Sequence, residues 1–349
     1  MKNKSILLIG NHLSTHQNNL ALTEQLAGKL QEHDWQVLTT SDRVNKLTRL
    51  LAVVGTIISK RKKYKIALVD VFSGPAFIWA FLSAFFLKIF KKPFILVLHG
   101  GNLPSFSKKF RFFVRQLFDW ANAICSPSTY LQKKLSHINP DIIIIPNPLE
   151  IKQYPFIKRK NPSANLIWLR AFHQIYNPNL VPATLALLTG QFPEINISMI
   201  GPDKGDGSLK MMETLAKKHL VEKQIKITLG VPKDQVPVFL NQGDIFINTT
   251  NIDNTPVSVI EALACGLAVV STNVGGIPYL LQHEEDALLV PPNDPEAMAA
   301  AVRRLLTEPG LAERLSVNAR KKAEQFDWEV ILPQWEKLFE EVLSTHEQT

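Results

Sequence analysis

Residues 253–278 read DNTPVSVIEALACGLAVVSTNVGGIP and decide the fold. A turn precedes a helix-forming run, in which Pro256 suits the first helical position and Thr255 can cap the helix. Gly266 tolerates the positive φ at which many helices end. Residues 268–271 continue as a strand of the kind that is buried on both faces of a parallel sheet. The stretch therefore predicts a helix followed by a buried strand, the repeating unit of an α/β protein.

The same stretch has the chemistry of an anion site. The first amides of a helix have no acceptor within the helix, and the helix dipole favours an anion such as a diphosphate there. Asp253 lies before the turn and Glu261 about one and a half turns after it, so both carboxylates can reach one ligand and accept from its hydroxyls. An exposed Asp and an ion-paired Glu on an ordinary helix are the alternative. The predicted ligand contacts here are Asp253, Asn254, Thr255, Pro256, Val257 and Glu261.

Apolar runs alternate with helical stretches on both sides of this segment. Because the runs are continuous, they indicate parallel strands buried on both faces. We predict an α/β fold of two tandem Rossmann-like, doubly wound domains, with a ligand cleft between the carboxyl ends of their sheets. The expected strands are 6–9, 37–40, 66–71, 94–98, 123–125, 142–145, 166–169, 195–200, 225–229, 245–248, 268–271 and 287–290, and the clearest helices are 20–31, 110–120, 257–264 and 295–306.

The boundary between the domains is expected in residues 150–165, a linker with two prolines, four basic residues and no sustained apolar period. We predict a first domain over residues 1–155 and a second over residues 156–326. Residues 327–349 carry apolar side chains at helical spacing and predict a closing helix, with a kink or a restart at Pro333.

Length and composition agree with a two-domain cytoplasmic protein. The chain has 349 residues, of which 46% are hydrophobic and 20% charged, as in globular proteins. Two cysteines cannot form a disulfide framework, which favours a reducing compartment. The apolar run at the N-terminus stops at Gly10, so it predicts a first strand rather than a signal peptide.

Positive charge is concentrated in the first half. Residues 1–150 carry 20 Lys and Arg against 8 Asp and Glu, whereas residues 151–349 carry 19 against 23. Basic clusters at 60–65, 88–92 and 108–115 favour an anionic partner such as a membrane surface, although solvated helix faces have the same pattern. We expect no nucleic acid partner, because only charge and no recognised motif points to one.

Residues 76–90 (AFIWAFLSAFFLKIF) form an almost wholly apolar stretch. It is too short to span a bilayer, which takes roughly 20 residues. Two interpretations stay open: a fully buried crossover helix, or a helix that lies partly in a membrane interface with the neighbouring lysines at the lipid headgroups.

The motif order resembles glycosyltransferase family 4, whose members have the two-domain GT-B fold. The family's donor-site signature is two acidic residues separated by seven others, then A-x-x-x-G, an apolar strand and G-G-x-P. Asp253 and Glu261 match the acidic pair, Ala262 and Gly266 follow, and Pro278 ends the pattern. Asp253 replaces a Glu and is one methylene shorter. Further matches are Pro146-Asn147-Pro148, Gly201-Pro202-Asp203 and Leu289-Val290-Pro291-Pro292.

The resemblance implies a retaining glycosyltransferase that takes a nucleotide-diphosphate sugar, with UDP or GDP as the nucleotide. It also implies a last helix that crosses back onto the first domain, and an acceptor bound by that domain. The family places an Arg and a Lys on the donor diphosphate. Arg170 matches the Arg, whereas Ile175 stands at the spacing of the Lys, so Tyr176, Asn177 or a nearby lysine would have to substitute.

Four further donor contacts are expected at the ends of predicted strands. Gly10 and Asn11 end the first strand, Gly201 follows the strand at 195–200, and Val231 follows the strand at 225–229, where it can touch the base. His99 ends an apolar strand before two glycines and resembles the family's first-domain histidine near the sugar. The predicted catalytic residues are His99, Arg170, Asp253 and Glu261.

No D-x-D sequence and no cysteine–histidine spacing suggests a metal, and no cofactor is expected. The basic, phenylalanine-rich first half favours a lipid-linked glycan acceptor at the inner face of the membrane, as in envelope polysaccharide synthesis. Two other functions stay open. A sugar-nucleotide epimerase can use the same fold, and a non-catalytic subunit could bind a nucleotide sugar without consuming it.

Overall fold

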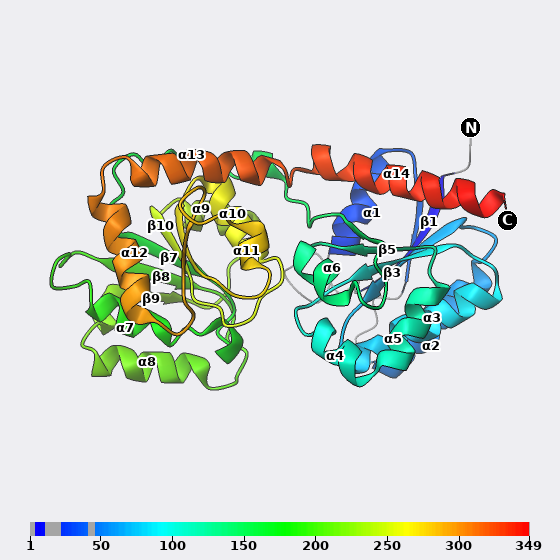
Figure 1. Ribbon diagram of the computed structural model, residues 1–349, viewed down its shortest axis with the longest axis horizontal. Coiled ribbons are helices and arrows are strands. Elements are labelled where there is room, and N and C mark those ends of the chain that lie inside the picture. Colours follow the sequence, from blue (N-terminus) through cyan, green and yellow to red (C-terminus); the bar gives the residue numbers. More distant parts are fainter. Residues whose placement is uncertain (1–3, 11–21, 41–45, 349) are drawn as a thin grey trace. The chain divides into compact units, whose positions relative to one another are not determined.

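The computed structural model describes residues 4–10, 22–40 and 46–348. The chain folds as two compact units: unit 1 comprises Met1–Pro148 and Trp328–Thr349, and unit 2 comprises Leu149–Asp327. Each unit contains a six-stranded parallel sheet with helices on both faces (Figure 1). The predicted fold class of two Rossmann-like domains is thus confirmed.

The sheet of unit 1 has the strand order β2-β1-β3-β4-β5-β6. The order reverses between β1 and β3, and ligands of open parallel sheets bind outside the carboxyl ends of strands at such a switch point. The strands are β1 (Ser5–Ile9), β2 (Gln36–Thr39), β3 (Ile66–Val71), β4 (Phe94–Leu98), β5 (Ala123–Ser126) and β6 (Ile142–Ile144). The helices are α1 (Leu22–Glu32), α2 (Lys46–Ser59), α3 (Phe77–Ile89), α4 (Leu103–Lys109), α5 (Arg111–Trp120), α6 (Thr129–Leu135) and α14 (Trp328–Glu347).

Helices α1 and α14 cover one face of this sheet, and α2 to α6 cover the other. The last helix therefore belongs to unit 1, as predicted, and its Phe339 ring lies edge-on to Trp35 with 5.3 Å between the centroids. Helix α14 continues through Pro333, so the predicted restart there is wrong. Apolar side chains at helical spacing, among them Ile331 and Trp335, supply the burial that holds the helix on the sheet.

The sheet of unit 2 reads β9-β8-β7-β10-β11-β12, the order of a dinucleotide-binding Rossmann fold, with its switch point between β7 and β10. The strands are β7 (Asn165–Leu169), β8 (Asn196–Ile200), β9 (Ile225–Thr228), β10 (Ile245–Asn248), β11 (Ala268–Thr272) and β12 (Leu288–Val290). The helices are α7 (Leu180–Ala186), α8 (Ser208–Lys218), α9 (Val236–Leu240), α10 (Val257–Cys265), α11 (Ile277–Leu280), α12 (Pro295–Thr307) and α13 (Leu311–Glu324).

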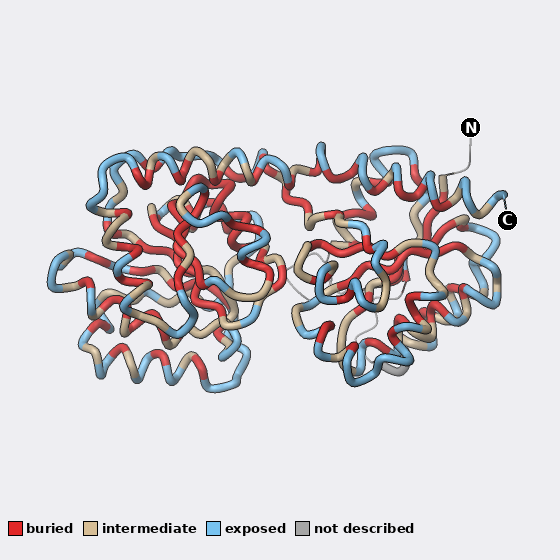
Figure 2. The backbone as a smooth tube through the Cα atoms, in the orientation of Figure 1, coloured by how far each residue is buried: buried red, intermediate tan, exposed pale blue. Residues whose placement is uncertain are grey.

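Two apolar layers enclose this sheet. Helices α7, α8 and α12 pack on one face and α9, α10 and α11 on the other, while α13 contributes to both layers. The central strands β1 and β4 of unit 1 and β10 and β11 of unit 2 are buried along their whole length (Figure 2). Since both faces of β10 and β11 are covered, their sequences are continuous apolar runs rather than alternating ones.

The predicted linker at residues 150–165 is instead part of unit 2. The side chains of Leu149, Ile151 and Tyr154 are buried in its core. Arg159 is also buried, and its Nε lies 3.0 Å from Asp244 Oδ1. The boundary therefore falls after Pro148 rather than after residue 155, because scattered apolar residues without a helical or strand period still fill the space beside the sheet.

Helix α3 contradicts the interpretation of a fully buried crossover helix. Ala80, Ala84 and Leu87 pack against the sheet of unit 1, but Ile78 is 56% exposed and Phe85 is 42% exposed. The helix is apolar on its outer side as well. Within the described residues, no helix has both the length and the apolar character needed to cross a bilayer.

Candidate functional site

The predicted site of unit 2 lies at its topological switch point. Arg170 directly follows β7, and the loop 249–256 follows β10, the neighbouring strand. Two hydrogen bonds tie the ends of these strands together: Trp168 Nε1 donates to Thr249 Oγ1 at 2.9 Å, and Thr249 Oγ1 donates to the Tyr176 carbonyl at 2.7 Å. The sheet thus holds Arg170 and the loop 249–256 in position.

Arg170 forms an ion pair with Asp253, and each side chain is only 13% exposed. The ring of Tyr176 covers the guanidinium, with 4.6 Å between the guanidinium carbon and the ring centroid. Burial lowers the pKa of Arg170 to about 10, and the charges of Tyr176 and Glu261 act in the opposite direction. Arg170 therefore stays protonated at neutral pH as a poorly solvated cation, which strengthens its attraction for an anion. The predicted Arg170, Asp253 and Glu261 do come together.

Helix α10 starts beside this ion pair. It begins at Val257, with Pro256 as the N-cap residue and no side-chain capping bond, so the predicted cap by Thr255 is wrong. The amides of Val259 and Ile260 donate to the Pro256 carbonyl, at 3.1 and 3.3 Å. Because the helix itself offers no acceptor to its first amides, those of Val257 and Ser258 provide donors for an anion.

The two glycines of the G-G-x-P sequence, Gly275 and Gly276, pack closely against the loop that follows β10. A Cβ on Gly275 would lie 2.1 Å from the Asp253 carbonyl oxygen, and a Cβ on Gly276 would lie 1.7 Å from the Asn254 carbonyl oxygen. The Gly276 amide also donates to the Asp253 carbonyl at 3.0 Å. The glycines thus let the backbone pack against the loop that carries Asp253, rather than against a ligand.

Glu261 is buried, with a side chain only 3% exposed. The Tyr154 hydroxyl donates to its Oε1 at 2.6 Å, and Lys233, in the short 3₁₀ helix η6 (Lys233–Gln235), forms an ion pair with it. Burial, and then the negative charge of Glu261, raise the pKa of Tyr154, so this phenol stays a donor. The alternative interpretation, in which Glu261 is ion-paired, is therefore confirmed for the ion pair itself. This pair also places Lys233 next to the site.

Sequence reasoning missed Lys233 and Tyr154. Lys233 lies two residues after Val231, in the loop after β9. That position, close to a predicted donor contact, could have marked it as a candidate. Tyr154 was hidden in the supposed linker. Neither Tyr176, which stacks on Arg170, nor Asn177, whose side chain donates to Asn293 Oδ1 at 3.0 Å, supplies positive charge. Lys233, which pairs with Glu261, is a lysine near this site, and its part in binding the donor stays a prediction.

The bond between Tyr154 and Glu261 can be tested through stability. We expect Tyr154→Phe to lower the free energy of unfolding by about 1.5–3 kcal/mol, the range for a hydrogen bond to a charged group. Tyr64→Phe is the matched control, since the buried Tyr64 hydroxyl donates to a neutral acceptor, the Ile57 carbonyl, at 3.2 Å. Urea unfolding measures both, and a smaller loss for Tyr154→Phe than for Tyr64→Phe would contradict this account of Glu261.

In unit 1, His99 Nε2 lies 2.9 Å from Asp70 Oδ1, and the imidazole stacks on Phe72 with 4.8 Å between centroids. Both contacts fix the ring. A Cβ on Gly10 would lie 2.3 Å from Asp70 Oδ2, so the glycine makes room for this carboxylate. The sequence signal for Asp70 was a single charge within the apolar run 66–71. Asn11 lies outside the described residues.

The remaining predicted contacts lie at strand ends. Gly201 follows β8, Val231 is half-buried against the core of unit 2, and the amide of Asn254 donates to Asp253 Oδ1 at 2.9 Å. In residues 4–10, 22–40 and 46–348, no three His, Cys, Asp or Glu side chains gather as metal ligands would, and metal independence stays a prediction. Both cysteines, Cys125 and Cys265, are buried free thiols.

This fold and site define a class of protein. The structure is similar to that of sucrose-phosphate synthase from Thermosynechococcus elongatus, with a TM-score of 0.81 and 17% identity over 98% of this chain and 100% of that chain. Anabaena Alr3699/HepE in complex with UDP and glucose gives a TM-score of 0.76 and 16% identity over 97% of this chain and 100% of that chain. Both likenesses concern the fold, which is that of the GT-B glycosyltransferases.

The sequence of unit 2 is similar to that of a known family. Residues 154–322 match the family described as Glycosyl transferases group 1. A D-inositol 3-phosphate glycosyltransferase of Streptomyces bingchenggensis is 26% identical over 158 residues, which cover 44% of this chain and 35% of that protein. The matched regions span between 10% and 51% of the length of three curated relatives.

Proposed function

We propose that the chain is a retaining glycosyltransferase that moves a sugar from a nucleotide-diphosphate sugar, bound by unit 2, to an acceptor bound by unit 1. The observation that carries the proposal is the buried Arg170, paired with Asp253 beside the amide start of α10 at the switch point of the sheet. Such a point is where α/β sheets bind nucleotides. The family match supports the transfer of a sugar.

In the proposed mechanism the protein acts mainly by electrostatics. Arg170 and the first amides of α10 stabilise the diphosphate as it leaves the anomeric carbon, which becomes oxocarbenium-like. The departing phosphate oxygen takes the proton of the acceptor hydroxyl, so no strong base is needed. Asp253 holds the guanidinium in position before the donor binds and then accepts from a sugar hydroxyl. We assign His99, oriented by Asp70, to the sugar as well.

We further propose that UDP or GDP is the nucleotide, that Glu261 accepts from the ribose hydroxyls, and that Lys233 supplies the second positive charge near the diphosphate. Two similar structures, both of Anabaena Alr3699/HepE, are complexes with UDP, which favours UDP. A carboxylate suits vicinal hydroxyls because it accepts two hydrogen bonds at once. We expect no metal in this mechanism, since the cations are provided by side chains.

The proposed acceptor is a lipid-linked glycan of cell-envelope polysaccharide synthesis, reached from the cytoplasmic side of an anionic membrane. Exposed aromatic side chains on α5 of unit 1 support this proposal: Phe112 is 73% exposed and Phe113 is 49% exposed. The ring of Phe113 in α5 lies edge-on to Phe81 in α3, at 5.8 Å. Exposed Lys108 and Lys109 provide positive charge beside them, as interfacial proteins do.

The test of the function is an assay of donor consumption with and without acceptor, in the presence of EDTA. We expect a radiolabelled UDP-sugar or GDP-sugar to pass to a lipid-linked glycan extract and to survive when no acceptor is present. Conversion of the donor without acceptor would identify an epimerase instead. Binding of the donor with no conversion under either condition would identify a non-catalytic subunit.

Glu261→Gln is expected to weaken donor binding by about tenfold, since it removes the charge that strengthens a hydrogen bond to hydroxyl donors. Calorimetric titration with UDP measures the effect. Asp286→Asn is the matched control, because Asp286 is an equally buried acidic residue of unit 2 that pairs with Lys322. If both variants bind UDP as the wild type does, Glu261 does not bind the ribose.

A further inference from the structure

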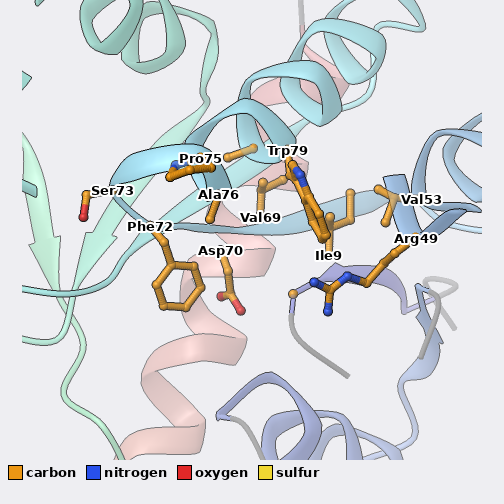
Figure 3. Close-up of a pocket in the computed structure, with 12 residues that line it drawn as sticks. Ile9, Arg49, Val53, Val69, Asp70, Phe72, Ser73, Pro75, Ala76 and Trp79 are labelled. Carbon is orange, nitrogen blue, oxygen red and sulfur yellow. The ribbon is translucent and has the colours of Figure 1, made fainter. Parts of the chain in front are cut away.

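A cavity of about 400 Å³ lies in unit 1, and Gly10, a predicted donor contact, is among the residues that line it. It opens at the carboxyl ends of β1 and β3, the switch point of that sheet, where Ile9 and Asp70 line it (Figure 3). Helices α2 and α3 close it with Arg49 and Trp79. The position is the one at which open parallel sheets bind ligands.

Arg49 is a buried cation with unmade hydrogen bonds. Its side chain projects from α2 over the ring of Trp79, with 4.2 Å between the guanidinium carbon and the ring centroid, and the residue is 9% exposed. Among the described residues, its Nε and Nη1 have no hydrogen-bond partner. Burial also lowers its pKa. A buried, unsatisfied guanidinium is costly, and an anion that accepts from it removes that cost.

Asp70, which lines this cavity, already has partners. Asp70 Oδ1 is 2.9 Å from His99 Nε2, and Asp70 Oδ2 accepts from the Thr23 hydroxyl at 3.4 Å. Within the described part of the chain, Arg49 has no ion pair with Asp70 or with any other acidic residue. The charge of Arg49 is therefore available to a ligand.

An apolar groove of about 480 Å³ adjoins the cavity. Pro75, in the short 3₁₀ helix η2 (Gly74–Ala76), lines both of them. Helix α3 separates the two spaces, with Trp79 on the side of the cavity and Phe81 on the side of the groove. Phe106, Phe110 and Phe113 form much of the rest of the groove. The cavity that holds the buried cation and the groove, whose lining has almost no polar atoms, therefore meet at Pro75.

We propose that this composite site binds an amphiphilic acceptor, a phosphate joined to a hydrocarbon chain, with the phosphate on Arg49 and the chain in the phenylalanine groove. The inference rests on the proposed function, in which unit 1 binds the acceptor, and it specifies the chemical class of that acceptor. The positive charge of Arg49 favours the phosphate, because a planar guanidinium can donate hydrogen bonds to two phosphate oxygens. Because Pro75 lines both spaces at the start of α3, a single occupant with both parts can reach from the cavity into the groove.

The experiment compares three probes below their micelle-forming concentrations: dodecyl phosphate, methyl phosphate and uncharged dodecyl maltoside. Binding is measured by the quenching of tryptophan fluorescence. The variant Trp79→Phe shows how much of this quenching comes from the tryptophan in the cavity. We expect dodecyl phosphate to bind the wild type at least tenfold more tightly than either other probe. Arg49→Gln removes this preference and leaves the affinity for dodecyl maltoside unchanged, whereas Arg49→Lys retains part of it.

Two further variants separate this site from its alternatives. Phe113→Ser alters an exposed side chain. We expect it to weaken the binding of dodecyl phosphate but not the binding of methyl phosphate. Arg170→Gln is expected to leave dodecyl phosphate binding intact. If Arg170→Gln abolishes that binding and Arg49→Gln does not, the anion site is in unit 2 and the inference is overturned. Equal affinities of wild type and Arg49→Gln for dodecyl phosphate overturn it as well.

The outcome for this site is independent of the outcome for the donor. UDP binding is measured on the same wild-type and variant proteins, and thermal melting confirms that each variant is folded. A protein that binds UDP but does not prefer dodecyl phosphate refutes the acceptor class and leaves the proposed function standing. A protein that prefers dodecyl phosphate but binds neither UDP nor GDP refutes the proposed donor and leaves the Arg49 site standing.

Discussion

Arg170→Ala is expected to lower kcat for sugar transfer by about 10²–10³-fold, the usual cost of removing one preorganised donor from a developing negative charge. The guanidinium is largely buried against Asp253 and Tyr176, so water replaces it poorly. The variant should show a lower kcat as well as a higher KM, because the negative charge on the diphosphate grows as the sugar departs. An assay of transfer from the preferred nucleotide sugar measures both.

The control for this variant is Arg304→Ala. Arg304 lies on α12 of unit 2 and forms ion pairs with Glu284 and Glu308. We expect its rate to equal that of the wild type. Arg170→Ala with a rate within about threefold of Arg304→Ala would exclude Arg170 from catalysis, provided that both variants melt as folded proteins.

Gly201→Ala is expected to destabilise unit 2 by about 3 kcal/mol or more, since it combines a strained backbone with a steric clash. Gly201 has a φ of 149°, and a Cβ there would lie 1.8 Å from the Arg170 carbonyl oxygen. Any relief of this clash has to move the backbone of Arg170. Urea unfolding should therefore show lost stability, and donor binding should be lost with it.

Gly205→Ala is the matched control for the clash. Gly205 also has a positive φ, of 71°, but a Cβ there would meet no atom within 4 Å. We expect a loss of about 1 kcal/mol from the left-handed backbone alone. If Gly201→Ala costs no more than Gly205→Ala, the close approach of β8 to Arg170 does not constrain the site.

The sequence predicts the sheets well because buried parallel strands leave a plain signal. The runs 66–71, 94–98 and 245–248 match β3, β4 and β10 to the residue, since each is a continuous apolar run bounded by turns. The start of α10 differs from the prediction in one respect. Pro256 takes the N-cap position and Val257 is the first helical residue, because the fixed φ of proline also fits a cap with an extended ψ.

Other parts of the site depend on contacts between distant segments, which one sequence does not reveal. Tyr154 and Glu261 are 107 residues apart, and Lys233 reaches the same carboxylate from a different loop. The supposed linker fails for the same reason, since Leu149 and Ile151 become recognisable as core residues only when the sheet beside them is known. Helix α3 is ambiguous in sequence because its inner and outer faces are equally apolar.

The central claim is that unit 2 binds a diphosphate through Arg170 and the start of α10. The most direct measurement is a calorimetric titration of the wild type and of Arg170→Ala with UDP, GDP and the two nucleosides. We expect one nucleotide diphosphate to bind the wild type at least about tenfold more tightly than its nucleoside, and we expect Arg170→Ala to lose this difference. Equal binding of nucleotide and nucleoside to the wild type, or an undiminished difference in Arg170→Ala, would contradict it.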